Sequence, residues 1–349
     1  MRIAAVGSAL PKNYYRQDEL IAALRAHWAT RYYNVDRIEA VHRNAMVGGR
    51  HLALRIEEYS KLDTFTATND AFIRCAVDLG AEAIDRGLEW AGLSRRDIDH
   101  IFFVSVTGVA TPSIDARLVN RLGLRPDIKR TPMFGLGCVA GAAGVARASD
   151  YLRGRPDEVA VVLSVELCSL TLQRDDLSMP NIVASGLFGD GAAAAVLTGT
   201  HRDGRGPEVV ATRSVFYPDT EEVMGWRIAD TGFQVVLSAD VPKVVEEHVG
   251  KDVDAFLGSH GLSRRDVSSY VCHPGGPRVL EALQAALGID REALAMTWRS
   301  LERIGNLSSA SVLMVLEDTM AERRPPAGSL GLLMAMGPGF CSELVLLRW

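Results

Sequence analysis

One internal repeat constrains the fold of this chain more than any other feature. The segment GLSRRDI occupies residues 92–98 and GLSRRDV occupies residues 261–267, so six of seven residues are identical at a distance of 169 positions. Each copy leads into an apolar stretch that predicts a strand, and each of these strands ends in turn residues. The repeat predicts two half-molecules of the same construction.

A second match follows the first at nearly the same offset. Gly137-Cys138 corresponds to Gly305-Asn306, and in both places a glycine-bearing turn precedes small residues and then an apolar helix. We therefore expect Cys138 and Asn306 to occupy matching positions, each at the start of a helix.

The order of predicted elements indicates an α/β protein. Helical periodicity over residues 72–88 is followed by an apolar strand at 101–106, and this alternation continues along the chain. We expect one half over residues 1–200 and the other over 207–349, joined by the polar segment GTHRDGRGPE.

An extra segment distinguishes the first half from the second. The residues between Ser8 and Thr66 are rich in charged and aromatic side chains, and the second half has no counterpart. Arms of this kind usually cover a binding tunnel or a partner, which is what we expect here.

Charge and hydropathy exclude several classes of protein. The formal net charge is −5 and no basic tract could follow a phosphate backbone, so nucleic acid is not an expected partner. Apolar runs such as 101–104 and 192–197 are far shorter than the roughly 20 residues of a membrane-spanning helix. Pro11 interrupts the first apolar stretch before a signal peptide could form, so we expect a cytoplasmic protein.

The cysteines are few and widely separated. Five are present, none in a CxxC pair, which argues against a disulfide framework and against a zinc or other metal site. Cys75, Cys168 and Cys272 lie in apolar patterns and are expected to pack in the core. Cys341 follows the turn 337–339, where a second thiol would approach a site.

Cys138 is the candidate nucleophile. A helix start contributes partial positive charge and free N–H groups, which favour a thiolate, and a nearby histidine could hold the proton. Gly137 and the small residues that follow Cys138 leave room above the sulfur for an acyl group. The alternative is that Cys138 is a small buried apolar residue in a helix of alanine and glycine.

Two further residues are candidates for the same site. His273 ends a predicted strand, and the Pro-Gly-Gly-Pro run after it forces a tight turn, as expected for a site residue. Asn306 matches Cys138 in position, although asparagine is also a preferred helix cap.

The chain resembles the type III polyketide synthases, and the resemblance covers nearly the whole chain in order. The motifs that carry it are GLGCVAGAAG around Cys138, GLFGDGAAAA at 186–195, CHPGGP around His273, GNLSSAS around Asn306 and MGPGF at 336–340. The segments FGLGC, TPSIDARL and ELCSLT are most similar to bacterial members that form alkyl pyrones. GLFGDGAA and the GN-S-S-A-S pattern also occur in related ketosynthases.

The resemblance implies a thiolase-like fold, two pseudo-duplicated halves in a layered αβαβα arrangement, with a Cys138-His273-Asn306 triad. Cys138 would take a starter from an acyl-CoA, with His273 as its ion-pair partner. Malonyl-CoA would then be decarboxylated while Asn306 and His273 donate hydrogen bonds to the enolate. No cofactor is implied beyond these CoA thioesters. The family forms homodimers, in which Thr111 would lie near the partner's cavity.

Substrate-binding positions are implied by the same resemblance. Phe188 and Phe233 match gatekeepers between a CoA tunnel and the cavity, with core packing as the alternative for both. Arg50 matches a basic residue near the CoA phosphates, with a solvated arginine as its alternative. The other substrate-binding positions are Thr107, Cys168, Thr171, Ser308 and Gly276.

The expected product is an alkyl pyrone or a resorcinol. Val106 stands where many plant relatives have a hydroxyl that favours carbon–carbon ring closure, and its absence favours a lactone, although Ser308 or Glu166 could position a water instead. A single-extension β-ketoacyl-carrier-protein synthase of the initiating type remains the main alternative. A thiolase would need Cys341 as a second catalytic cysteine, and the motif typical of papain-like hydrolases is absent.

Overall fold

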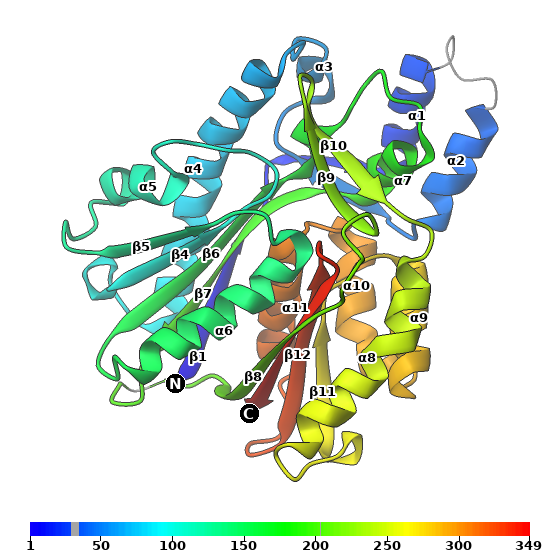
Figure 1. The fold of residues 1–349 in the computed structure, drawn as a ribbon. Helices are drawn as coiled ribbons and strands as arrows, with labels where there is room; N and C mark the ends of the chain where they lie inside the picture. Colours follow the sequence, from blue (N-terminus) through cyan, green and yellow to red (C-terminus); the bar gives the residue numbers. More distant parts are fainter. Residues whose placement is uncertain (29–34, 203) are drawn as a thin grey trace.

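The computed structural model describes residues 1–28, 35–202 and 204–349, and its elements form five alternating layers (Figure 1). Helices α4 and α5 cover one outer face, and α8 and α9 cover the other. Helices α6 and α11 lie in the middle, between the strands of the first half and those of the second. The expected αβαβα arrangement is confirmed.

The first half contains five strands and four helices outside the arm. These are β1 (Arg2–Ala9), α4 (Phe65–Ala91), β4 (His100–Val104), α5 (Ile114–Leu122), β5 (Lys129–Met133), α6 (Ala140–Arg153), β6 (Val159–Leu167), α7 (Met179–Leu187) and β7 (Asp190–Thr198). The second half, in chain order, consists of β8 (Glu208–Phe216), the hairpin β9 (Met224–Ala229) and β10 (Gly232–Leu237), α8 (Val241–Gly258), β11 (Val267–Cys272), α9 (Pro277–Leu287), α10 (Ala295–Ile304), α11 (Ser309–Glu322), β12 (Leu330–Gly337) and β13 (Cys341–Arg348).

The two halves have the same strand order. The first runs β1-β7-β6-β4-β5 and the second β8-β13-β12-β11, and a single residue pair, Arg2 with Glu208, joins them into one hydrogen-bonded series. In each half the strand that follows the long outer helix has a parallel neighbour on its inner side, β6 beside β4 and β12 beside β11. The duplication predicted from seven residues therefore extends to four strands of each half, while β5 and the arm have no counterpart.

The repeated heptapeptide performs the same local task twice. In the first copy, Ser94 N–H donates to Asp97 at 2.8 Å, and in the second, Ser263 N–H donates to Asp266 at 2.8 Å. Both are capping boxes that start a short 3-10 helix between an outer helix and a central parallel strand. The repeat is thus a connector. Its first copy joins α4 to β4, and its second copy joins α8 to β11.

The two central helices approach each other closely because α6 is built from small residues. A Cβ atom added at Gly141 would lie 2.2 Å from the Ser309 carbonyl at the start of α11, and one at Gly144 would lie 2.5 Å from Val162 Cγ1 of β6. No side chain fits in these gaps. The glycines therefore set the distance between α6, α11 and the first sheet.

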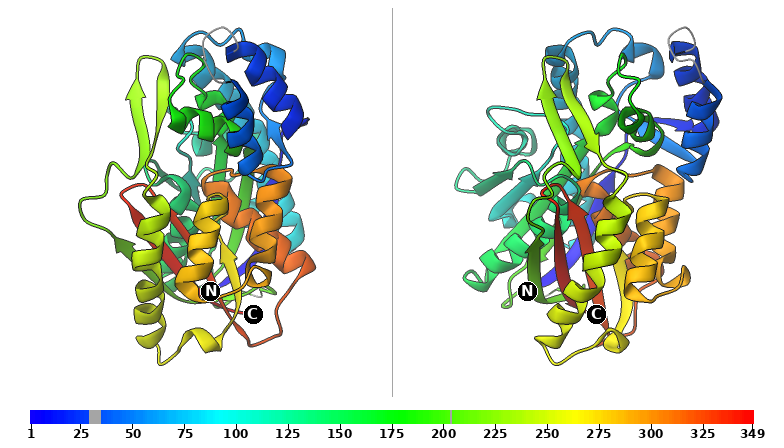
Figure 2. Two further views of the ribbon diagram at one scale, coloured as in Figure 1. Left: turned by 90° about the vertical axis from the view of Figure 1, so that its right-hand side faces the viewer. Right: turned by 45° about the vertical axis from the view of Figure 1, so that its right-hand side comes forward.

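The arm predicted between Ser8 and Thr66 folds beside α7, and Figure 2 shows it at the same end of the molecule as the projecting β9–β10 hairpin. It consists of β2 (Asn13–Arg16), α1 (Gln17–Trp28), α2 (Val35–Asn44), β3 (Gly49–Leu52) and the short α3 (Ile56–Tyr59). Its helices α1 and α2 contact α7, so the arm covers the region just before β7.

Three further expectations from the sequence concern disulfide bonds, membrane-spanning helices and metal sites. All five cysteines are free, as predicted. Within the described residues, no helix is long and apolar enough to cross a bilayer, and no cluster of three or more histidine, cysteine or acidic side chains is arranged to hold a metal ion.

The contact at Gly141 yields a prediction about stability. Gly141→Ala should lower the free energy of unfolding by about 1–3 kcal/mol, because the new methyl group collides with the Ser309 carbonyl. Gly258→Ala is the matched control, since no atom lies within 4 Å of the added Cβ there, and it should leave stability unchanged or raise it slightly. Denaturant unfolding monitored by circular dichroism measures both. Equal stability of the two variants would contradict the packing argument.

Candidate active site

Cys138 lies at the entrance to the central helix α6. It belongs to the 3-10 turn η2 (Gly137–Val139), which runs directly into α6, and it is 7% exposed. The turn needs glycine at 137, where φ is 54° and an added Cβ would lie 2.6 Å from Pro338 Cδ. The MGPGF turn therefore packs against the cysteine-bearing turn and holds it in place.

Asn306 occupies the equivalent place before α11. Gly305, with φ at 75°, ends α10, and the backbone of Asn306 is bonded to the end of α7 through Leu187 O at 3.0 Å and Gly189 N at 2.9 Å. The side-chain amide is oriented at both ends: Nδ2 donates to Gly275 O at 3.3 Å, and Oδ1 accepts from Ser308 N at 2.8 Å. One N–H of the amide remains for a substrate oxygen.

His273 follows the last residue of β11. Its backbone N–H continues the parallel ladder to Met334 O at 3.0 Å, and Gly275 N–H then closes a tight turn onto the His273 carbonyl at 2.9 Å. The imidazole is buried, and neither Nδ1 nor Nε2 has a hydrogen-bonding partner among the described residues. Both nitrogens are thus available to the cysteine and to a substrate.

The structure brings these three residues together at one small cavity. Cys138, His273 and Asn306 all line a space of about 30 Å³, enough for one or two waters. Most of the remaining wall is apolar and includes Leu187, Phe188, Met224, Leu237, Val241 and Phe340. Cys138 Sγ also lies 3.5 Å from Ser308 Oγ. Two helix starts and one strand end, far apart in sequence, converge on the sulfur.

Burial opposes separate ionisation of the cysteine and the histidine. It raises the pKa of Cys138 to about 12 and lowers the pKa of His273 to about 3, in contrast to the thiolate-favouring shift expected from the helix start alone. Taken separately, the thiol therefore stays protonated and the imidazole stays neutral at neutral pH. We therefore expect a thiolate to form only if its proton passes to His273, so that the two charges stabilise each other beside the start of α6.

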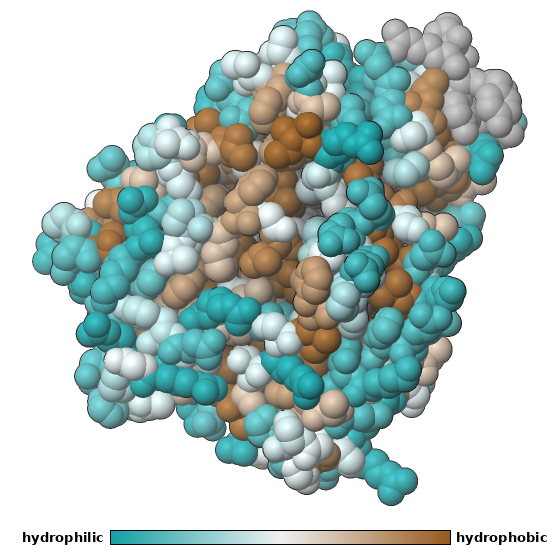
Figure 3. All heavy atoms as spheres, viewed as in Figure 1, coloured by the Kyte–Doolittle hydropathy of each residue, from teal (hydrophilic) through white to brown (hydrophobic). Residues whose placement is uncertain are grey.

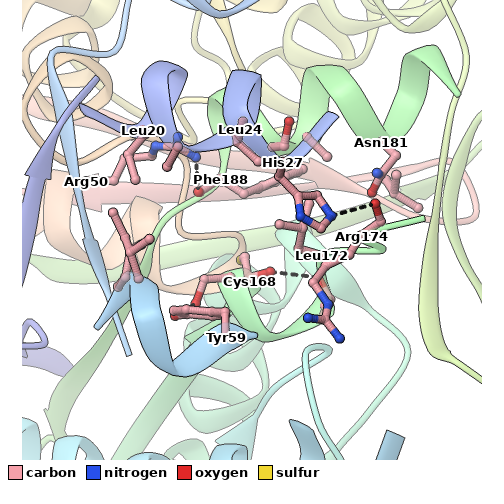
Figure 4. A pocket seen from close by; sticks show the side chains of 18 of the residues that line it. Leu20, Leu24, His27, Arg50, Tyr59, Cys168, Leu172, Arg174, Asn181 and Phe188 are labelled. Carbon is pink, nitrogen blue, oxygen red and sulfur yellow. Dashed lines mark hydrogen bonds between the residues drawn. The ribbon is translucent and has the colours of Figure 1, made fainter. Parts of the chain in front are cut away.

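A larger second cavity lies on the other side of Phe188. Its volume is about 270 Å³, and its walls come from the arm, from α7, from the turn η3 (Cys168–Thr171) and from the β9–β10 hairpin (Figure 4). Phe188 lines both cavities, so its side chain stands at their border. Of the other predicted substrate-binding residues, Arg50, Cys168 and Thr171 line this second cavity.

Four predicted positions lie outside both cavity walls. Phe233 is buried in an aromatic cluster, with its ring centroid 5.5 Å from that of Phe65, and its role as a gatekeeper stays a prediction. Thr107 donates to the buried Glu166 at 2.8 Å. Ser308 is nevertheless in contact with Cys138. Gly276 directly precedes α9, and its neighbour Gly275 lines the small cavity instead.

Arg50 and Cys341 differ from their expected surroundings. Arg50 is only 3% exposed, so it is not a solvated arginine, and its place near CoA phosphates stays a prediction. Cys341 Sγ donates to Pro338 O at 3.2 Å, and Cys341 does not line the catalytic cavity. Thr111 lies in an exposed loop after β4.

Several lining residues were not identified from the sequence. Leu20, Leu24, Tyr59 and Trp226 line the larger cavity, and Figure 4 shows the first three on arm elements around it. Their local patterns are those of ordinary helices and strands. The only indication of these lining residues in the sequence was the prediction that the arm covers a binding tunnel. That prediction identifies the segment but not the individual residues that face the cavity.

Comparison with known proteins gives consistent matches along the chain. Residues 1–201 match the family model described as chalcone and stilbene synthases, N-terminal domain, and residues 208–349 match its C-terminal counterpart. A 1,3,6,8-tetrahydroxynaphthalene synthase from Streptomyces peucetius subsp. caesius is 51% identical, with 99% of this chain and 93% of that protein covered. A putative chalcone synthase from Bacillus subtilis is 36% identical, covering 99% of this chain and 98% of the relative.

The fold comparison agrees with the sequence comparison. The crystal structure of 1,3,6,8-tetrahydroxynaphthalene synthase from Streptomyces coelicolor, described as a bacterial type III polyketide synthase, superposes with a TM-score of 0.95. That match is 32% identical and covers 100% of this chain and 99% of the other.

The electrostatics of the site predict how the thiol reacts. His273→Gln should slow alkylation of Cys138 by iodoacetamide near neutral pH by at least about tenfold, because the buried thiol loses the group that accepts its proton. In this variant the rate should also rise about tenfold for each pH unit from 7 to 10, since the thiolate fraction grows in that proportion below the pKa. Peptide mass spectrometry measures modification of Cys138.

The exposed His201 supplies the control for this experiment. His201→Gln changes a histidine whose side chain is 63% exposed, and it should leave alkylation unchanged. Wild-type rates in His273→Gln would exclude His273 as the proton acceptor.

Proposed function

The chain belongs to the chalcone and stilbene synthase family and is a type III polyketide synthase, and on that premise we propose that it extends acyl chains on Cys138 with malonyl-CoA. The observation that carries the proposal is the convergence of Cys138, His273 and Asn306 on one buried cavity. The reaction needs CoA thioesters as substrates and no further cofactor.

Loading is a transfer of an acyl group between two sulfur atoms. The Cys138 proton passes to His273, and the thiolate attacks the thioester carbon. The new carbon–sulfur bond forms as the bond to CoA breaks, and the imidazolium returns its proton to the departing CoA thiolate. The apolar wall of the cavity keeps water away from the acyl-enzyme, so hydrolysis does not compete.

Extension uses the same cavity for a second thioester. When malonyl-CoA loses carbon dioxide, the electrons of the broken bond move onto the thioester oxygen, so the site must donate hydrogen bonds at that oxygen. The free N–H of Asn306 Nδ2 and the imidazole of His273 supply them. The enolate carbon then attacks the acyl carbon on Cys138, and the cysteine thiolate leaves from a chain two carbons longer.

The larger cavity supports several extensions. Its volume of about 270 Å³ begins at Phe188, next to the catalytic cavity, and gives a lengthening chain a place to fold. An initiating synthase that extends once needs no such chamber. We therefore favour repeated condensation over the single-extension alternative.

The product we propose is an aromatic polyketide built from malonyl-CoA units. A relative that is 51% identical along nearly the whole chain is named for 1,3,6,8-tetrahydroxynaphthalene, which supports this product class over an alkyl pyrone. The pyrone or resorcinol expected from the sequence remains the second candidate, because most of the larger cavity's wall is apolar and suits an alkyl starter.

We also propose a homodimer, in the cytoplasm. Strand β5 is the outer strand of the series and contains Pro132, and the exposed residues Val109 and Phe134 follow the carboxyl ends of the parallel neighbours β4 and β5. Figure 3 shows hydrophobic side chains gathered over the middle of one face of the molecule. Thr111 lies in the same loop as Val109, which would bring it close to a second copy.

Product analysis tests the proposed reaction. Purified protein given malonyl-CoA alone should release carbon dioxide and yield an aromatic pentaketide-type product, identified by mass spectrometry after chromatography. Product that requires a long-chain acyl-CoA would favour the alkyl pyrone, and a single β-keto product on a carrier protein would favour the initiating synthase. Absence of any condensation product with all starters would contradict the proposal.

The roles of Cys138 and Asn306 can be separated. Cys138→Ala should abolish acyl loading, because the attacking sulfur is gone. Asn306→Ala should load normally and slow malonyl-CoA decarboxylation by about two to three orders of magnitude, the loss typical of an oxyanion donor. Intact-protein mass spectrometry measures loading, and released carbon dioxide measures decarboxylation. The assignment is wrong if Asn306→Ala fails to load but still decarboxylates.

A further inference from the structure

Arg50 is a buried cation with few partners. It lies in β3 of the arm, is 3% exposed and lines the larger cavity. Its guanidinium makes one hydrogen bond, from Nη1 to the Phe188 carbonyl at 2.8 Å (Figure 4). Nε has no hydrogen-bonding partner among the described residues. Since a guanidinium has five N–H donors, most of its binding capacity is unused.

No carboxylate forms an ion pair with Arg50 within 4.0 Å among the described residues. The carboxylate that attracts it most is Asp190, whose oxygens already accept from Ala53 N–H at 2.6 Å and from Ser169 N–H at 2.8 Å. Burial lowers the pKa of Arg50 to about 10, so the group stays charged at neutral pH. A buried charge without a close counter-ion is unfavourable, and an anionic ligand beside it would offset that cost.

The second arginine of the cavity provides a contrast. Arg174 donates to Asp63 at 2.6 Å and to the Leu62 carbonyl at 3.2 Å, so its charge is compensated within the protein. Arg50 has no equivalent of Asp63. The larger cavity therefore contains one neutralised arginine and one that is free to pair with a ligand.

We infer that Arg50 binds an ionised oxygen of the growing poly-β-ketone chain and so determines how many extensions the chain undergoes. This inference rests on the proposed function, because it needs a chain that enters the larger cavity past Phe188. Arg50 would be a substrate-binding residue that acts on the chain already made, away from the reacting sulfur.

The chemistry of the ligand matches the chemistry of the site. A methylene between two carbonyl groups loses a proton far more readily than that of a simple ketone, and the resulting enolate shares its charge between two oxygens. A guanidinium offers paired N–H groups in one plane, which suit a pair of oxygens that share a charge. Arg50 also holds the Phe188 carbonyl, so it lies where the chain crosses from one cavity to the other.

Two substitutions of Arg50 test its effect on chain length. With malonyl-CoA, Arg50→Gln should release short products, mainly triketide and tetraketide pyrones, and the share of full-length product should fall at least about tenfold, the loss expected for one charge-assisted hydrogen bond. Arg50→Lys keeps the charge and should retain an intermediate share. Acyl loading of Cys138 and the thermal midpoint show whether each variant is folded.

A binding measurement gives a second test that needs no turnover. Triacetic acid lactone is a short polyketide whose enol ionises, and its O-methyl ether has nearly the same shape without the charge. Calorimetry on Cys138→Ala protein should show that the lactone binds at least about tenfold more tightly than the ether. In the Cys138→Ala protein, a second substitution Arg50→Gln should remove this preference for the lactone. The second substitution Arg174→Gln in the same background should leave the preference unchanged.

The outcomes separate this inference from the proposed function. If wild-type protein makes no polyketide from any starter, the proposed function fails. If it makes one and Arg50→Gln, folded and loaded, gives the same product lengths, Arg50 does not control extension. Equal affinity of lactone and ether for the Cys138→Ala protein would overturn anion binding at Arg50 even if the Arg50 variants do not fold.

Discussion

The close approach of two helix starts is the constraint on which the rest of the structure depends. Cys138 stands before α6 and Asn306 before α11, and the two helices come together because Gly141 leaves no side chain between α6 and the Ser309 carbonyl. The pseudo-symmetry of the halves makes the two helix starts equivalent, and the packing makes them neighbours. The polar ends of two long elements therefore lie in the middle of the protein, where water is scarce.

Burial of the site away from water explains both its reactivity and the free energy needed to keep its polar groups unpaired. Burial prevents Cys138 and His273 from ionising separately, so proton transfer within the pair becomes the route to a thiolate. The same burial strengthens the hydrogen bonds that Asn306 can donate to a developing enolate. At the far side of Phe188 it leaves Arg50 charged and incompletely paired. In each case a polar group that is unpaired in the free protein gains a partner when a substrate occupies the cavity.

Properties that act over a few residues could be predicted from the sequence, and properties that depend on distant segments could not. The repeated heptapeptide acts within a few residues, through the capping boxes at Ser94 and Ser263, so its two copies could be matched along the chain and the strand after each could be predicted. Arg50 and Phe233 were harder, because an arginine in a polar arm and a phenylalanine in a strand look the same whether they face solvent, core or ligand. Their surroundings are contributed by segments more than a hundred residues away, such as Phe188 beside Arg50 and Phe65 beside Phe233.

The amino-acid sequence by itself determined that the chain has two similar halves, that each has a glycine turn before its central helix, and that a cysteine and an asparagine occupy those turns. Glycine conformation, capping and apolar periodicity act over a few residues, so they can be recognised along the chain. The sequence also proposed His273 and Phe188 for the site, but only the tertiary structure decided that Cys138, His273 and Asn306 line one small cavity, which residues line the larger one, and that Arg50 is buried beside it. These features depend on packing between distant segments, and packing is a property of shape in three dimensions that no short stretch of sequence contains.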